Sequence, residues 1–157
     1  MNMRVASCML TSLVLAAAAP ACHATCFVSA VNLAFGGYDS LRIGHTDSTG
    51  NVAVTCTGKS GNYFYYTLAL NAGGAGTFAT RRMRSATPGA LNYNIYLGAN
   101  RSVVWGNGSG GSSVITDVMA LNSLSGTRNY PIYGRIFARQ NAPAGIYSDS
   151  IVVTLEF

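Results

Sequence analysis

The sequence predicts an all-β protein, an antiparallel sandwich or barrel, because of three features. After residue 24, no stretch sustains a helical period of apolar residues. Short runs of alternating apolar and polar residues recur instead, each bounded by Gly, Asn, Ser or Pro. In the last run, residues 145–157, one row is mixed and the other is apolar, and the apolar row is Ile151, Val153, Leu155 and Phe157.

This last run also raises a question about its neighbours. A strand in a sheet pairs on both sides, or one of its edges stays open. The sequence stops at Phe157, inside the apolar row. We therefore expect either an earlier strand or another chain to cover the second edge.

Residues 1–24 have the pattern of a secretory signal peptide. Arg4 places a positive charge before a short apolar run of small residues, and Cys22-His23-Ala24 resembles a cleavage site. The run is shorter than the ~20 residues that span a bilayer. The alternative is a lipoprotein with Cys22 as the lipidated residue, but the residues before Cys22 lack the usual Leu. We expect residues 25–157 to form one exported domain.

The mature chain keeps two cysteines, Cys26 and Cys56. A single pair in an exported chain predicts a disulfide, whereas two buried thiols are disfavoured in an oxidising compartment. In the chain-entropy model such a bridge contributes ~3–4 kcal/mol. Charged residues make up only 10% of the sequence, and the balance is mildly basic. This pattern differs from the basic face of a nucleic-acid-binding protein.

The strands can be placed in order from their alternation and from the turn residues between them. The first breaks near Asn32 and is followed by a turn and a glycine-containing loop over residues 36–51. Residues 114–124 are ambiguous and are assigned to a strand. The predicted strands are residues 26–35, 51–57, 63–70, 77–83, 91–97, 102–105, 114–124, 129–138 and 145–157.

Four of these runs carry a clear row of residues at alternate positions. Residues at every second position share one face of a sheet. The row Phe64, Tyr66, Leu68 and Leu70 is expected to face the core. The other rows, each on one face of its strand, are Val52, Val54 and Cys56; Leu91, Tyr93, Ile95 and Leu97; and Tyr130, Ile132, Gly134 and Ile136.

The sequence gives little support to an enzyme or a metal site. After the signal peptide only one histidine, His45, and one lysine, Lys59, remain. A zinc site needs three or four suitable ligands, and His45 with Asp47 supplies two at most. His45 could act as a catalytic base, but there is no Gly-x-Ser-x-Gly elbow. We interpret His45 as an exposed loop residue and expect no catalytic residue, metal or cofactor.

Two further patterns have simpler explanations than ligand binding. Residues 106–111 fit Gly-x-Gly-x-x-Gly, but the residues after them make a poor helix, so we expect a hairpin loop. Arg81, Arg82 and Arg84 could bind an anionic surface, with Arg82 and Arg84 on one face and Arg81 on the other. We favour a solvated strand end. The nine tyrosines could line a carbohydrate or protein face, but half-buried packing is more common.

Several motifs together resemble one family. The mature chain resembles the spore coat protein U domain, which also occurs in subunits of archaic (Csu-type) chaperone–usher pili. The matching motifs, in order, are Phe35-Gly36-Gly37-Tyr38, Val54-Thr55-Cys56-Thr57-Gly58, Arg81-Arg82-Met83, Leu91-Asn92-Tyr93-Asn94-Ile95-Tyr96, Val104-Trp105-Gly106-Asn107-Gly108, Tyr133-Gly134-Arg135-Ile136, and Gln140-Asn141-Ala142-Pro143-Ala144-Gly145 with Tyr147 and Asp149.

The resemblance implies an immunoglobulin-like sandwich that lacks its last strand. A periplasmic chaperone would fill the groove first, and the N-terminal extension of a neighbouring subunit would fill it in a fibre. The implied partners are the chaperone, an outer-membrane usher and other pilus subunits. The implied edge of the groove is the apolar row of Ile151, Val153, Leu155 and Phe157.

The expected function is thus a non-enzymatic, secreted subunit of pili or a surface coat that serves adhesion or biofilm formation. It would pass through the periplasm to the cell surface. Because only Thr25 precedes Cys26 after cleavage, the chain could accept a strand but could not donate one, which predicts a tip, a cap or a coat protein. The alternative is a free-standing secreted binding domain, with carbohydrate as one ligand class.

Overall fold

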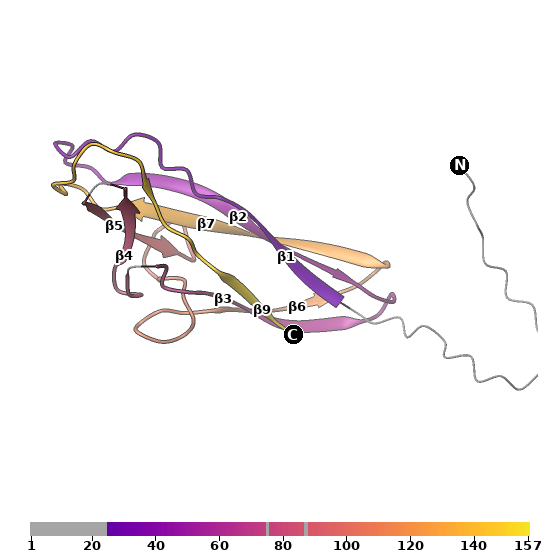
Figure 1. Cartoon of the computed structure of the whole chain (residues 1–157). Coiled ribbons are helices and arrows are strands. Elements are labelled where there is room, and N and C mark those ends of the chain that lie inside the picture. Colours follow the sequence, from indigo (N-terminus) through magenta and orange to yellow (C-terminus); the bar gives the residue numbers. More distant parts are fainter. Residues whose placement is uncertain (1–24, 75, 87) are drawn as a thin grey trace, which may run out of the picture.

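The computed structural model describes residues 25–157 except residues 75 and 87, and these residues form two antiparallel sheets (Figure 1). The larger sheet has the order β1-β2-β7-β5-β4-β8, and the smaller has the order β6-β3-β9. No helix occurs in this described part, and the predicted all-β class is confirmed. The strands are β1 (Thr25–Val31), β2 (Thr46–Thr57), β3 (Tyr63–Leu70), β4 (Arg81–Ser85), β5 (Ala90–Tyr96), β6 (Ile115–Ala120), β7 (Ser125–Ile136), β8 (Tyr147–Ser148) and β9 (Val153–Glu156).

The hydrophobic core lies between the two sheets and is built from the alternating rows. β2 and β7 pair along their whole length, from Thr46 opposite Ile136 to Thr57 opposite Ser125. Because alternate side chains of each strand point to the same face, one row of each strand enters the core. The predicted core row, Phe64, Tyr66, Leu68 and Leu70, is buried. From the other three rows the buried residues are Val52, Val54, Cys56, Leu91, Tyr93, Ile95, Ile132 and Ile136.

Trp105 belongs to the hydrophobic core and is fully buried. Its indole Nε1 donates a hydrogen bond of 3.2 Å to the carbonyl oxygen of Leu68 on β3. The predicted strand at residues 102–105 is present only as isolated bridges, Tyr96 to Val104 and Trp105 to Ser113. This short segment therefore links the larger sheet to the loop around the glycine-rich motif.

β2 begins five residues before the predicted start, in a stretch that the sequence assigned to a loop. Polar residues and Gly50 concealed the strand there. Gly50 is required by close packing, because a Cβ atom at this position would lie 2.6 Å from the carbonyl oxygen of Val31. Asp47 accepts hydrogen bonds from Arg135 on β7, so a polar cross-strand pair stabilises this end of β2.

The prediction of one continuous strand over residues 145–157 is wrong. The run forms β8, which pairs with β4 in the larger sheet, and β9, which pairs with β3 in the smaller sheet. Residues 149–152 cross between the sheets. The Asp149 carboxylate fixes this crossing by accepting hydrogen bonds from the Tyr93 hydroxyl and from the amides of Gly74 and Ser150.

Candidate functional site

One side of the sandwich is bordered by two edge strands, one from each sheet. Among the described residues, β1 pairs with β2 alone and β9 pairs with β3 alone. The two strands lie close to each other in space, and the chain after β1 runs along the segment that leads into β9 (Figure 1). Backbone groups on the outer edge of an edge strand are free to pair with a further strand.

A cavity of about 480 Å³ opens between these two borders. We call it the groove, and define it by its two walls, which are residues 30–33 with Phe35 and residues 147–151 with Val153. Its floor comes from both sheets and consists of the side chains of Leu70, Met83, Tyr93, Ile95 and Ile132. An engineered apolar cavity of ~150 Å³ holds one benzene molecule, so the groove has room for about three groups of that size.

The first wall is formed by Leu33 and Phe35, which lie over β7. They pack closely against Gly134, where a Cβ atom would lie 2.7 Å from Phe35 Cζ and 2.9 Å from Leu33 Cδ1. The Phe35 ring also meets the Tyr93 ring edge to face, with centroids 6.1 Å apart. The glycine of the Tyr133-Gly134-Arg135-Ile136 motif therefore makes room for this wall.

The second wall contains part of the predicted apolar row. Ile151 and Val153 line the groove, and Leu155 packs against the core next to it. Phe157 is 62% exposed and lies outside the packed cluster. The structure thus brings three of the four predicted residues together and leaves Phe157 apart.

Sequence reasoning missed several residues that form the groove. Leu33 and Phe35 follow the predicted break in the first strand, and their i, i+2 spacing was the signal that could have identified them. Asp149 was noted only as a motif residue, but its carboxylate lies in the groove wall. Burial, together with the hydrogen bond to Asp149, raises the pKa of the Tyr93 hydroxyl well above its usual range, so Tyr93 stays a neutral donor.

The Cys26–Cys56 disulfide joins β1 to β2. The two residues are directly opposite each other in the β1–β2 pair, and the bridge is formed, as the sequence predicted. Their Sγ atoms are 2.04 Å apart. Because β1 has one strand neighbour in the described chain, the bridge adds a covalent link to an edge that borders the groove.

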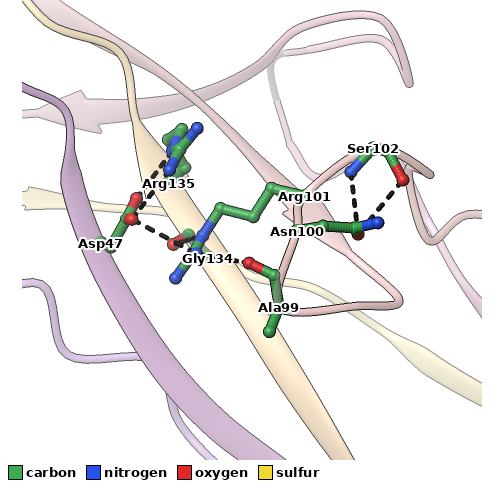
Figure 2. Close-up of polar contacts among 7 residues, drawn as sticks. All are labelled: Asp47, Ala99, Asn100, Arg101, Ser102, Gly134 and Arg135. Carbon is green, nitrogen blue, oxygen red and sulfur yellow. Dashed lines mark hydrogen bonds and ion pairs between the residues drawn. The ribbon is translucent and has the colours of Figure 1, made fainter.

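A second polar cluster lies away from the groove, where the loop after β5 contacts β2 and β7 (Figure 2). Asp47 accepts hydrogen bonds of 2.7 and 2.9 Å from Arg135 and forms an ion pair of 3.3 Å with Arg101. The Arg135 hydrogen bond, assisted by the charge of Arg101 and opposed by partial burial, lowers the pKa of Asp47. Arg101 also donates to the carbonyl oxygens of Gly134 and Ala99. The cluster fastens the loop to the sheet.

The remaining candidate residues have structural surroundings. His45 is exposed, as expected, and its Nδ1 accepts a hydrogen bond from the Ala138 amide. Residues 106–111 form a loop without a following helix, which agrees with the hairpin interpretation. In the described ranges, no three His, Cys, Asp or Glu residues come together as metal ligands. Helices long and apolar enough to cross a membrane are likewise not found there.

The arginine cluster is divided between two environments. Arg82 and Arg84 are exposed, in line with a solvated strand end, but Arg81 is completely buried. The interpretation of all three as solvated residues is therefore wrong for Arg81. The guanidinium binds carbonyl oxygens and an amide inside the molecule, which compensates for the loss of water.

Known proteins are similar to this chain in sequence or in fold. The sequence profile of the Spore Coat Protein U domain matches residues 10–154. Protein U of Myxococcus xanthus is 30% identical over 133 residues, which cover 80% of this chain and 71% of that protein.

The fold is similar to a chain in the crystal structure of the CsuC–CsuE chaperone–tip adhesion subunit pre-assembly complex, from archaic chaperone–usher Csu pili of Acinetobacter baumannii. The TM-score is 0.60 at 23% identity, over 86% of this chain and 40% of that chain. At this identity the similarity concerns the fold, which is the predicted immunoglobulin-like sandwich. The profile match and the identity with Protein U show that this chain belongs to the Spore Coat Protein U domain family.

Proposed function

We propose that this chain is a secreted, non-enzymatic subunit of a chaperone–usher pilus or a surface coat, and that a strand from another protein completes it. The observation that carries the proposal is the groove between two edge strands of different sheets. A strand placed there could pair with the free edges of β1 and β9 and direct alternate side chains onto the apolar floor of the groove. Strand addition of this kind combines backbone hydrogen bonds with side-chain pockets.

The partners follow from this geometry and from the relatives. A periplasmic chaperone would supply the strand first, and a neighbouring subunit would replace it at an outer-membrane usher. The fold neighbour, a chain of a chaperone–subunit pre-assembly complex, supports the first of these steps. We propose residues 1–24 as the signal for export and residues 25–157 as the domain that passes through the periplasm to the cell surface.

The position in an assembly depends on the mature N-terminus. If cleavage follows Ala24, Thr25 is the only residue before Cys26. A donor strand needs about 10 residues to span a groove at ~3.3 Å per residue. Such a subunit accepts a strand without donating one, which fits a tip or cap subunit or a coat protein outside a fibre.

The test compares two neighbouring substitutions of the same chemistry. Ile151 lines the groove, whereas Val152 points away from it and is 58% exposed. Both are changed to Asp, and each variant is expressed in the periplasm together with the chaperone of its own assembly system. An unpaired charge in the groove costs several kcal/mol. We therefore expect Ile151→Asp to lower the amount of soluble chaperone complex at least tenfold and Val152→Asp to leave it near the unmodified level.

Expression without the chaperone separates this proposal from the free-standing binding domain. A chain that needs a partner strand should aggregate at the high concentrations of overexpression without chaperone, because its open edges recruit other strands. Aggregation depends on concentration, so the experiments on the chain without a partner, described below, use purified chain refolded at high dilution. Equal soluble yield with and without chaperone, together with equal yields of the two variants, would contradict strand addition.

A further inference from the structure

The buried charge of Arg81 is unexplained by the proposed function, since this residue does not line the groove. Its side chain is 0% exposed, although it carries the charge that is hardest to neutralise among the side chains. Burial lowers the pKa of the guanidinium, which nevertheless stays protonated. A buried cation is tolerated only where polar groups replace its water.

Polar groups from three separate segments surround this guanidinium. Nη1 donates to Asn94 Oδ1 at 2.7 Å, and Nη2 donates to the carbonyl oxygens of Trp105 at 2.7 Å and Asn71 at 2.8 Å. Nε donates a further bond to Asn71. The Phe78 ring lies over it, with its centroid 5.5 Å from the guanidinium carbon. Arg81 thus connects β5, the Trp105 segment and the residue that follows β3.

Asn71 carries this connection to the groove wall. Its amide donates to the carbonyl oxygen of Val152 at 3.1 Å, and its side-chain Oδ1 accepts from the Val152 amide at 3.0 Å. One residue thus holds both backbone groups of Val152, which lies between the groove residues Ile151 and Val153.

The same turn holds the crossing segment at a second point. The Gly74 amide donates to Asp149 Oδ1 at 2.9 Å. Asn71 Oδ1 also accepts a hydrogen bond from the Gly73 amide, which keeps the turn folded. A Cβ atom at Gly73 would lie 2.1 Å from Asp149 Oδ2, so the turn and the crossing are in tight contact. Residues 71–74 therefore fix residues 149–152 at both ends.

We infer that Arg81 is a positioning residue for the groove: through the backbone of Asn71 it holds the crossing segment, residues 149–152, and thereby forms the β9 edge before a partner strand arrives. The last step, the arrival of a strand, rests on the proposed function. Because the edge is already formed, an incoming strand does not have to order it, and less conformational entropy is lost on binding.

Hydrogen–deuterium exchange of the chain without any partner tests this role. Amides exchange through local openings, so the method separates a local effect from a loss of global stability. Arg81→Met removes all four hydrogen bonds. Asn71→Ala removes only the side-chain bonds to Val152 and Gly73, at an exposed position where folding is less at risk. Arg82→Met is the matched control, since Arg82 is the exposed neighbour on the same strand.

We expect both Arg81→Met and Asn71→Ala to accelerate exchange at least tenfold in residues 149–156, while β2 and β7 exchange as before. Arg82→Met should leave every segment unchanged. Unchanged exchange in residues 149–156 would overturn the inference, and so would an equal acceleration in all strands, which would make Arg81 a stabiliser of the whole fold. No partner is present in this experiment, so its outcome is independent of whether strand addition occurs.

Discussion

At the scale of single residues, a network of side-chain hydrogen bonds around Asp117 connects strands of both sheets. Arg128 donates two hydrogen bonds of 2.8 Å to the Asp117 carboxylate, and the Tyr130 hydroxyl donates one of 2.6 Å. Tyr130 also shares a hydrogen bond with Tyr66 on β3. This network joins β6 and β3 of the smaller sheet to β7 of the larger sheet, and so it links the two sheets.

We predict that the Asp117 network makes the fold less stable in acid. Partial burial raises the pKa of Asp117, but the hydrogen bonds from Tyr130, Arg128 and the Val118 amide outweigh it and lower the pKa below the ordinary 3.8. A lowered folded-state pKa gives stability that is present above the unfolded-state value and is lost as the pH falls through the folded-state value.

Asp117→Asn should therefore lower the free energy of unfolding by about 1–2 kcal/mol at pH 7, because the charge-assisted hydrogen bonds with Arg128 are lost and the partial exposure of that ion pair limits their contribution. The difference from the unmodified chain should shrink below pH ~4. Urea titrations monitored by the fluorescence of the single tryptophan, Trp105, measure both values. A difference that is the same at pH 7 and pH 3 would contradict the prediction, as would the absence of any coupling to Tyr130→Phe.

Gly134→Ala tests the close packing of the first groove wall. The new methyl group would collide with Leu33 and Phe35, and overpacking of this kind costs ~1–3 kcal/mol. Gly44→Ala is the control, because no atom lies within 4 Å of its Cβ position. We expect the urea midpoint to fall for Gly134→Ala only. Equal urea midpoints of the two variants would contradict close packing, because they would show that Leu33 and Phe35 move aside without loss of stability.

At the scale of strands, the disulfide determines how firmly β1 is held. The bridge joins residues 30 apart in the sequence, and closing a loop of this length contributes ~3–4 kcal/mol in the chain-entropy model. We predict that Cys26→Ala with Cys56→Ala lowers the free energy of unfolding by about this amount. Two alkylatable thiols in non-reduced protein purified from the periplasm would contradict the bridge itself.

The strands that the sequence predicted well are those that face the core. The rows in β2, β3, β5 and β7 alternate because one face is buried and the other is hydrated, and period-two alternation records that difference directly. The early start of β2 could not be predicted in this way. There the pairing depends on polar contacts such as Asp47 with Arg135 and on the absence of a side chain at Gly50.

The groove was only partly predictable for a related reason. The apolar row of residues 151–155 was visible, but the crossing between sheets depends on Asp149, Tyr93 and the turn at Asn71, which lie far apart in the sequence. Arg81 was misjudged because arginine is rarely buried, and the carbonyl oxygens that hold it come from segments whose proximity only the fold creates.

At the scale of the whole molecule, the position in an assembly is testable by labelling. If cleavage follows Ala24, as we propose, the mature chain accepts a strand but has too few residues before Cys26 to donate one, and it should occur at fibre tips or outside fibres. We predict that immunogold labels appear at tips or as a diffuse coat, and that the mature protein has fewer than ten residues before Cys26 by N-terminal sequencing. Regular labelling along the shaft would contradict this role.

The central proposal concerns which edges of the sandwich receive a partner strand. The described chain has four strands at sheet edges, namely β1, β8, β6 and β9. Hydrogen exchange of the chain alone and in its complex with the chaperone distinguishes them in one experiment. We predict slower exchange in the complex at β1 and β9, with β6, which does not line the groove, unchanged as the internal control. Protection at β6, with β1 and β9 exchanging as in the free chain, would contradict strand addition in the groove.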